Sequence, residues 1–420
     1  MTLRATYQVT SRLPLEVTAE LIAKEQSSGD WPHGRPAAAA ALRDRALARI
    51  VEAKQTEVTS GDLQLPLSIP DDVHADGLHG GRVEIEFPNY DPACGLSNLL
   101  NVIAGEPHHL GMLTAVKLVD FHLSDSELCT LFDGPRFGAR KLRQLLDVPA
   151  RPLLCAPVKP ATGLLPEEFA GLAYEAAAGG ADIIKDDELY FGLPYAPLAE
   201  RVPLAVAAVR RAEDESGDKK LYIANVCADL ENLDGNLDLA TRMGADGVLV
   251  CPAIMGPSIV SYVRNRTNLM VLSHNAMVTA MTRVPDFGMT LGLWARISKL
   301  SGADIIVMPT PYGTFGISEA EFCDACEQAT GAEVGPGALP GFAGGKTMLS
   351  VSQFAAKLNS SDFAVVVGAA LFEHPLGVRA GAASIRRACE EIAGPVAPPD
   401  PALAEAMRVA AGQARSYRPF

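Results

Sequence analysis

Beyond residue 150 the chain repeats one pattern of hydrophobic and polar positions: a short apolar run, then a longer stretch with apolar residues at helical spacing. Such runs are typical of parallel strands buried on both faces, and the stretches between them, such as 166–180 and 198–216, are long enough for crossover helices. Eight such units favour a closed (β/α)8 TIM barrel over an open sheet. The predicted strands lie within 153–160, 181–188, 221–227, 247–254, 269–275, 305–309, 339–345 and 363–370.

The tripeptide Gly-Ala-Asp recurs in phase with these runs. It occupies 180–182, 244–246 and 302–304, at the start of the second, fourth and sixth predicted strands. We expect each glycine to end a helix and each aspartate to open a strand. Chance recurrence of a common loop tripeptide is the alternative, but the shared phase favours the barrel.

The first 125 residues mix both periodicities and predict a separate α+β domain of ferredoxin-like type. Strands are predicted at 4–11, 81–88 and 111–124, and helices at 16–26 and 38–54. The segment 27–36 is polar with glycine and proline, and we expect a mobile loop there. The predicted organisation is an N-terminal α+β domain over 1–125, the catalytic barrel over 126–395, and a C-terminal helix and tail over 396–420.

Composition narrows the function classes. With 48% hydrophobic residues the chain can bury a large core, and its net charge of −14 argues against binding nucleic acid or anionic membranes. There is no apolar stretch of membrane-spanning length, and the N-terminus lacks the apolar core of a signal peptide. Eight scattered cysteines are typical of reduced thiols, so we expect a cytoplasmic protein. Cys323 and Cys326 form a CxxC without a second pair, which argues against a zinc or redox site.

Reactive side chains lie where the predicted strands end, and the catalytic residues of a barrel gather at the carboxyl ends of its strands. The second strand ends in Lys185, Asp186, Asp187 and Glu188. Because strand residues alternate in direction, Lys185, Asp187 and Glu188 can converge, and two carboxylates there suit Mg²⁺. The alternative is a solvated charge run, but four charged residues make an awkward end for a buried strand.

Further candidates lie at other strand ends. Lys159 follows the first strand and could act as a base, although many lysines only extend to solvent. His274 follows the fifth strand, where it could equally be a hydrogen-bonding residue. Glycines at 344, 345 and 368 follow strands seven and eight, whose loops commonly bind phosphate through backbone N–H groups. Tight packing at a helix start is the other interpretation of these glycines.

Together these stretches resemble the large subunit of ribulose-bisphosphate carboxylase, and more closely its RuBisCO-like, form IV, relatives. The resemblance covers nearly the whole chain, and GGADIIKDDE is its most specific motif. The matching stretches are AKEQSSGDW (23–31), GLSNLL (95–100), PVKPATGL (157–164), GGADIIKDDE (179–188), HNAM (274–277), GFAGG (341–345) and EHPLG (373–377).

The resemblance implies a role for each matching residue. Lys185 would react with CO₂ to form a carbamate and hold Mg²⁺ with Asp187 and Glu188. Lys159 would take a proton from the carbon next to the substrate carbonyl, and His274 would be a further active-site residue. Substrate-facing and partner-facing positions follow in the same way. The phosphate-binding positions would be Gly344, Gly345, Gly368, Ala369 and Ala370. Glu25 and Asn98 would complete the partner subunit's site in a homodimer with shared active sites.

Several positions depart from the carboxylase pattern. Ala161, Asn275, Val278 and Ala343 replace a lysine, an arginine, a histidine and a serine, and 310–322 contains no lysine where the flexible-loop lysine is expected. We still expect Asn275 and Ala343 to contact substrate. One phosphate site is kept and the other lost, which argues against a bisphosphate substrate and against CO₂ fixation.

What remains supports proton abstraction beside a carbonyl. We expect a Mg²⁺-dependent enolase or isomerase that acts on a sugar-derived monophosphate through a metal-stabilised enediolate. Methylthio-pentulose phosphates of methionine salvage are examples of such substrates. The resemblance implies that salvage enolases use an N-terminal-domain lysine, and 82–116 has none, which weighs against that activity. A decarboxylase or transcarboxylase of a 3-oxo sugar-acid phosphate and a non-catalytic regulatory or stress-related protein are the alternatives.

Overall fold

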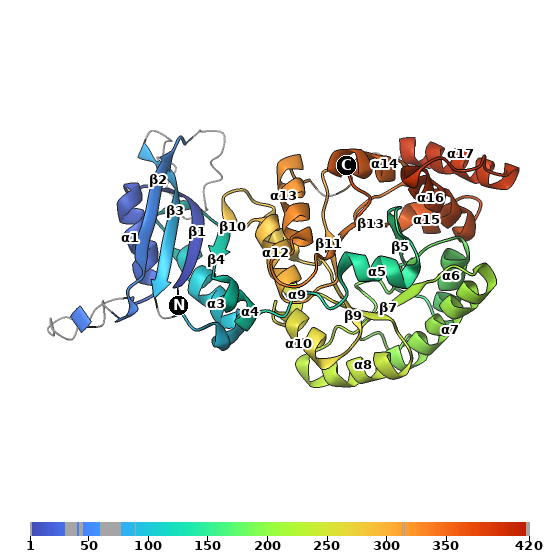
Figure 1. The fold of residues 1–420 in the computed structure, drawn as a ribbon, viewed down its shortest axis with the longest axis horizontal. Helices are drawn as coiled ribbons and strands as arrows, with labels where there is room; N and C mark the ends of the chain where they lie inside the picture. The colour runs from blue at the N-terminus through green and yellow to red at the C-terminus, as the bar shows by residue number, and fades with distance from the viewer. Residues whose placement is uncertain are drawn as a thin grey trace. The chain divides into compact units, whose positions relative to one another are not determined.

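The computed structural model describes residues 2–416 except 30–39, 42–44, 59–76, 89, 313 and 315. The chain folds into two compact units (Figure 1). Unit 1 comprises Met1–Asp133 together with Val278–Trp294, and unit 2 comprises Gly134–Met277 and Ala295–Phe420. The domain limits at 125/126 and 395/396 stay predictions.

Unit 1 is built on a mixed sheet. Within its described residues the strand order is β10-β4-β1-β3-β2, antiparallel except for the parallel pair β10–β4. The strands are β1 (Thr2–Ser11), β2 (Arg49–Thr56), β3 (His79–Pro88), β4 (Leu113–His122) and β10 (Phe287–Met289). The helical elements are α1 (Leu15–Glu25), η3 (Pro92–Cys94), α3 (Gly95–Ala104), η4 (Pro107–His109), α4 (Asp125–Leu131) and α11 (Val278–Thr282).

The predicted helix over 38–54 is wrong at its C-terminal end. Residues 49–56 form β2, which pairs with β3 from Arg49 opposite Glu86 to Thr56 opposite Gly80. Residues 45–46 are helical, whereas 38–39 and 42–44 lie outside the described part. The reason is that almost every β2 side chain is exposed, so no apolar stripe holds a helix, and the free edge of β3 supplies backbone partners instead. The predicted loop over 27–36 falls largely outside the described residues.

Unit 2 contains the closed parallel barrel that the sequence predicts. In the described part of the chain its order is β11-β12-β13-β5-β6-β7-β8-β9, with β9 returning to β11. Each predicted run contains one strand, shorter than the run. Lys185 is the last residue of its strand, and Asp186, Asp187 and Glu188 follow it. The strands are β5 (Leu153–Pro157), β6 (Ile183–Lys185), β7 (Leu221–Asn225), β8 (Gly247–Val250), β9 (Met270–Ser273), β11 (Ile305–Met308), β12 (Leu339–Phe342) and β13 (Ala364–Val366).

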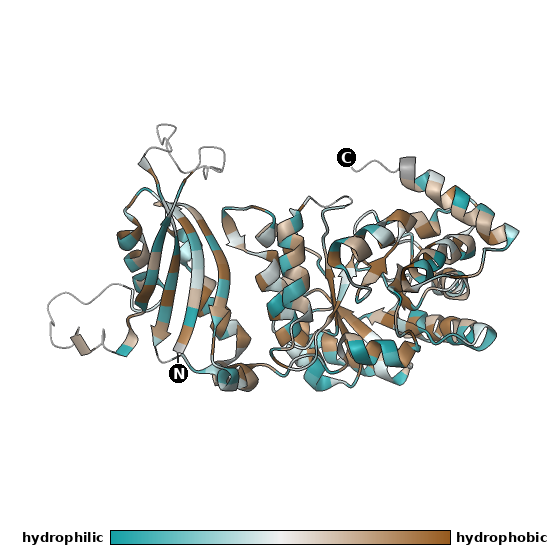
Figure 2. Ribbon diagram, turned by 45° about the horizontal axis from the view of Figure 1, so that its top comes forward, coloured by the Kyte–Doolittle hydropathy of each residue, from teal (hydrophilic) through white to brown (hydrophobic). Residues whose placement is uncertain are grey.

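Amphipathic helices surround the barrel, and their ribbons carry both hydrophilic and hydrophobic bands (Figure 2). Among the described residues no helix is both long and apolar enough to cross a bilayer. The helices after unit 1 are α5 (Gly138–Leu146), α6 (Pro166–Ala178), α7 (Leu198–Ser216), α8 (Leu230–Arg242), α9 (Pro252–Met255), α10 (Ile259–Arg266), α12 (Leu291–Leu300), α13 (Glu319–Thr330), α14 (Met348–Leu358), α15 (Ala369–Phe372), α16 (Val378–Ala393) and α17 (Pro401–Ser416).

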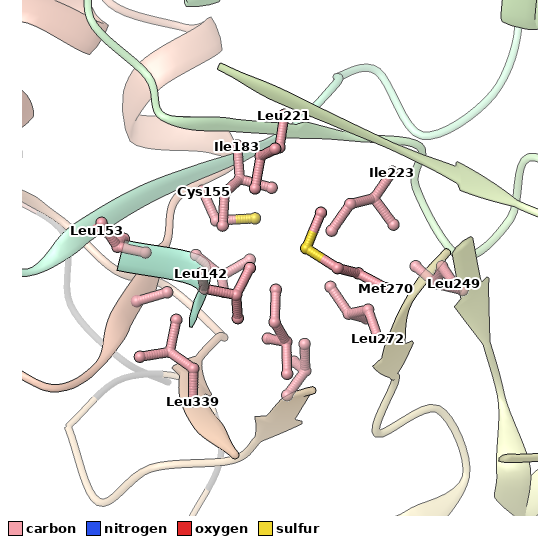
Figure 3. Close-up of a cluster of buried hydrophobic side chains, with 14 of the residues drawn as sticks. Leu142, Leu153, Cys155, Ile183, Leu221, Ile223, Leu249, Met270, Leu272 and Leu339 are labelled. Carbon is pink, nitrogen blue, oxygen red and sulfur yellow. The ribbon is translucent and has the colours of Figure 1, made fainter. Parts of the chain in front are cut away.

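The barrel interior is filled by alternate residues of its strands (Figure 3). Leu153 and Cys155 of β5, Ile183 of β6, and Leu142 of α5 are buried in this cluster. The remaining strands contribute in the same alternation, with Leu221, Ile223, Leu249, Met270, Leu272, Ile305, Val307, Leu339, Ala364 and Val366. Because the side-chain period of a strand is two, this core fixes which residues beyond each strand face inward.

The recurring Gly-Ala-Asp tripeptides have a structural explanation. Gly180, Gly244 and Gly302 have φ values of +103°, +83° and +110°, which glycine adopts without strain after a helix. The aspartates then accept a backbone N–H from a neighbouring strand: Asp182 from Leu154, Asp246 from Tyr222 and Asp304 from Val271. The repeat therefore joins neighbouring strands at the amino end of the barrel and is not part of the chemical site.

Candidate functional site

The inward register of the barrel leads directly to the predicted site. Continuing β5 from Leu153 and Cys155 in steps of two reaches Pro157 and Lys159. The same step from Ile183 reaches Lys185 and Asp187. Equivalent steps lead from Leu272 on β9 to His274, from Leu339 on β12 to Ala343, and from Val366 on β13 to Gly368.

These residues line one cavity of about 260 Å³ at the carboxyl end of the barrel. It brings together the candidate base, metal, histidine and phosphate positions named above. Its lining comprises Pro157, Lys159, Lys185, Asp187, Glu188, His274, Asn275, Ala343, Gly344, Gly345, Lys346, Val366, Gly368, Ala369 and Ala370. Glu25 and Asn98 belong to α1 and α3 of unit 1 and are outside this lining set.

The charged groups of the cavity are arranged in pairs. Lys159 Nζ lies 2.5 Å from Asp187 Oδ2. Lys185 is buried, donates a 3.0 Å hydrogen bond to the carbonyl of Asp186, and lies 4.0 Å from Glu188 Oε2. The carboxylates of Asp187 and Glu188 thus face lysines on two adjacent strands, so the site holds opposite charges at short range.

His274 lies beside these carboxylates. Its Nδ1 accepts a 3.2 Å hydrogen bond from the backbone N–H of Ala276, and its Nε2 is 3.4 Å from Glu188 Oε2. Burial lowers the pKa of His274 from its usual 6.5, and Cys251 acts in the opposite direction. The burial of His274 therefore favours the neutral form of its imidazole.

Asp186 faces away from the cavity because consecutive residues of an extended segment point in opposite directions, and its neighbours Lys185 and Asp187 face inward. Its carboxylate accepts hydrogen bonds from Arg201 (2.8 Å), Tyr222 (2.6 Å) and the backbone N–H of Asn225 (2.8 Å). The side chain of Asn225 in turn donates to the carbonyls of Asp187 and Glu188, at 3.0 Å each. This buried network fixes the segment that presents the two outer carboxylates.

Glycines after β12 and β13 form a further part of the cavity wall. Gly344 and Gly345 line the cavity and have φ values of +83° and +64°, which glycine adopts without strain. A Cβ at Gly368 would lie 3.0 Å from Lys159 Cε, so a larger residue there would require the lysine side chain to shift by a few tenths of an ångström. The wall therefore combines the glycines predicted to bind phosphate with the space that the candidate base occupies.

Sequence reasoning missed Lys346. It follows the two glycines directly, lines the cavity and is only 3% exposed. The available signal was a charged residue inside the stretch GFAGGK, but a lysine in a loop usually extends to solvent.

A larger cavity of about 500 Å³ is lined by residues of the 190–201 and 225–236 segments. None of the predicted catalytic or metal-binding residues lines it. The predicted catalytic and metal-binding residues line the smaller cavity.

The donor set fits Mg²⁺ held with a lysine carbamate. In the described residues no three His, Cys, Asp or Glu side chains gather closely enough to hold a metal. Asp187 and Glu188 supply two carboxylates, which leaves a hard cation short of a third protein oxygen ligand. After Lys185 loses its ammonium proton, addition of CO₂ to the amine with release of a second proton would form a carbamate, an anionic oxygen donor that completes the set.

Comparisons with known proteins agree with this fold. The family profile of the ribulose bisphosphate carboxylase large chain, catalytic domain, matches residues 138–408. Ribulose bisphosphate carboxylase-like protein 2 of Rhodopseudomonas palustris is 32% identical over 95% of this chain and 92% of its own. A 3-oxo-isoapionate-4-phosphate transcarboxylase/hydrolase of Xanthobacter autotrophicus is 30% identical over 86% of each chain. The crystal structure of a RuBisCO-like protein from Burkholderia fungorum has a TM-score of 0.83 at 28% identity, covering 99% of this chain and 100% of that one.

The eight-stranded barrel with a mixed-sheet unit is the RuBisCO fold. The chain belongs to the ribulose bisphosphate carboxylase large-chain family and fits its RuBisCO-like, form IV, members.

Proposed function

We propose that this protein is a Mg²⁺-dependent enolase or isomerase that removes a proton from the carbon next to the carbonyl of a sugar-derived monophosphate. One observation carries the proposal: a single cavity gathers Lys159, Lys185, Asp187, Glu188 and His274 with a glycine wall. A base, an electrophile and an anion site within one small cavity are the parts that enolisation requires.

Each residue has a distinct part in this chemistry. Lys185, Asp187 and Glu188 would hold Mg²⁺, which family members use together with a carbamylated lysine. When bound, the metal would polarise the substrate carbonyl and make the adjacent proton more acidic. Lys159, after releasing its own proton, accepts the substrate proton at Nζ. His274 presents an Nε2–H to an oxygen of the substrate, and a second proton transfer completes an isomerisation.

The substrate class follows from the walls of the cavity. Gly344, Gly345 and the backbone at Gly368–Ala370 would receive one phosphate group, and Asn275 and Ala343 would contact the sugar chain. Ala161, Ala343 and the absence of lysine from 310–322 each remove a part of the carboxylase pattern. We therefore propose a monophosphate substrate, for example a methylthio-pentulose phosphate, and no fixation of CO₂.

We further propose a cytoplasmic homodimer with shared active sites. Glu25 and Asn98 match family residues that complete the partner subunit's site, and both lie in unit 1 rather than in the lining of the barrel cavity.

Decarboxylation or transcarboxylation of a 3-oxo sugar-acid phosphate is the second candidate. The relative from Xanthobacter autotrophicus, named as a transcarboxylase/hydrolase of 3-oxo-isoapionate 4-phosphate, favours it. In this reaction the bond to the carboxyl carbon breaks, its electron pair stays on the neighbouring carbon, and the resulting enediolate is the same kind of species. Lys159 would then return a proton to that carbon instead of removing one.

Solvent proton exchange tests the proposal. The protein is incubated with Mg²⁺ and bicarbonate in D₂O, and a panel of pentulose and sugar-acid monophosphates is followed by NMR. We expect deuterium to replace the α-proton of at least one pentulose phosphate, and omission of Mg²⁺ should stop the exchange. Release of CO₂ from a 3-oxo acid without prior exchange would instead support the second candidate. Absence of both reactions across the panel would contradict enolisation and support a non-catalytic role.

A further inference from the structure

Lys346 carries a buried charge that the chemistry above does not use. Its ammonium group donates a hydrogen bond to the backbone carbonyl of Tyr312 and lies 5.3 Å from the centre of the Phe354 ring. Among the residues that the structure describes, no carboxylate forms an ion pair with it. Burial lowers the pKa of Lys346 from 10.5 to about 7.

Lys346 differs from the other two lysines of the cavity in its ionic partners. Lys159 is paired with Asp187 at 2.5 Å, and Lys185 lies 4.0 Å from Glu188. Of the three lysines that line the cavity, only Lys346 has no carboxylate opposite it. A buried cation without a counter-ion is costly, so an anion bound in the cavity would stabilise the protonated form of Lys346.

The position of Lys346 indicates which part of a ligand would supply that anion. It follows Gly344 and Gly345, and all three residues line the cavity. Its ammonium also contacts the loop after β11, the segment 310–322 that contains no lysine. The ammonium group of Lys346, from the loop after β12, therefore lies where that loop meets the loop after β11.

We propose that Lys346 is the anion-binding side chain of this cavity and pairs with the dianionic phosphate of the substrate at the glycine wall. This inference rests on the proposed function only for the place of the phosphate. Lys346 would make the site selective for dianionic esters over neutral sugars, because an uncharged ligand leaves its ammonium group without an anionic partner.

Sulfate is a suitable probe because it is a tetrahedral dianion whose charge stays constant between pH 6 and 9. Its binding is measured by calorimetry without Mg²⁺ on the wild type, Lys346→Met and Lys346→Gln. Met keeps the length of the side chain, and Gln keeps a donor for the Tyr312 carbonyl while removing the charge. Lys357→Met on α14 is the matched control, because Lys357 pairs with Glu319 and does not line the cavity.

We expect each Lys346 variant to bind sulfate at least about tenfold more weakly at pH 6, and Lys357→Met to match the wild type. Wild-type affinity should also fall about tenfold or more between pH 6 and 8.5, as the ammonium group loses its proton. The other charged groups facing the cavity are Lys159, Lys185, Asp187, Glu188 and His274. They remain in the variants, so the part of the pH dependence that disappears belongs to Lys346.

Wild-type sulfate affinity in a folded Lys346→Gln protein would overturn the proposal. So would a pH dependence that is unchanged in both variants. If Lys346→Met fails to fold, Lys346→Gln decides the outcome. Because sulfate binding involves no turnover, this test can fail while proton exchange succeeds, and it can succeed while exchange fails.

Discussion

Asp186 offers a prediction whose size can be worked from the structure. We expect Asp186→Asn to destabilise the barrel strongly although the residue does not line the cavity. Its carboxylate is fully buried and receives three hydrogen bonds, from Arg201, Tyr222 and the backbone of Asn225. Arg201 is equally buried, so removal of the carboxylate charge leaves a guanidinium group without a counter-ion.

Loss of one partner of a buried ion pair typically costs about 3–5 kcal/mol. Arg201 keeps its hydrogen bonds to the carbonyls of Ala196 and Tyr190, which hold it in place but do not neutralise it. At roughly 2–4 °C per kcal/mol for a domain of this size, the melting temperature should fall by about 6–20 °C. Thermal unfolding followed by circular dichroism, with urea unfolding for the free energy, measures the loss.

A double-mutant cycle separates the ion pair from other effects. Arg201→Met alone should also destabilise, and the double variant should cost at least about 2 kcal/mol less than the sum of the two single changes. Glu215→Gln on the same helix removes the exposed pair with Arg211 and should leave the melting temperature unchanged. A loss below about 1 kcal/mol for Asp186→Asn, or an additive cycle, would refute the reasoning.

Two further predictions concern the walls of the cavity. The pKa of Lys346 is about 7 in the folded protein against the usual 10.5, so the unfolded chain binds more protons between these values, and stability rises with pH across that window. Lys346→Met should therefore raise the free energy of unfolding of the ligand-free protein at pH 6 by up to about 5 kcal/mol, and this gain should vanish toward pH 10.5. Urea unfolding at several pH values measures the gain. Destabilisation by Lys346→Met at pH 6 would contradict the burial of an uncompensated charge. Gly368→Ala places a Cβ 3.0 Å from Lys159 Cε and so displaces the candidate base. We expect this change to slow proton exchange by on the order of tenfold to a hundredfold, with little change in melting temperature. Exchange at the wild-type rate would show that the position of Lys159 is not critical.

The barrel could be predicted because its strands are buried on both faces. Continuous apolar runs such as 247–254 and 305–309 leave few alternatives, and the two-residue period of a strand carries the inward register to Lys159, Asp187 and His274. The same two-residue period places Asp187 toward the cavity and Asp186 away from it. What the run of four charged residues did not indicate was the buried partner of Asp186, because Arg201 lies fifteen positions further along the chain.

The features that were missed depend on distant contacts. β2 has almost no buried side chain, and its pairing with β3 decides its conformation. β10 has only three residues and joins unit 1 by pairing with β4, more than 160 positions earlier. Lys346 is buried by Tyr312 and Phe354, which come from a different loop and a helix, so its local sequence does not indicate that its charge is enclosed.

The central claim is that Lys159 moves the substrate proton in this cavity. Its most direct test is the rate of α-deuterium exchange in Lys159→Met, measured beside the wild type and Lys357→Met in the presence of Mg²⁺ and bicarbonate. Sulfate affinity and melting temperature are measured on the same samples, to establish that the cavity and the fold are intact. We predict that exchange falls by at least about a hundredfold in Lys159→Met alone while sulfate still binds. Exchange at the wild-type rate in a folded Lys159→Met protein would contradict the account.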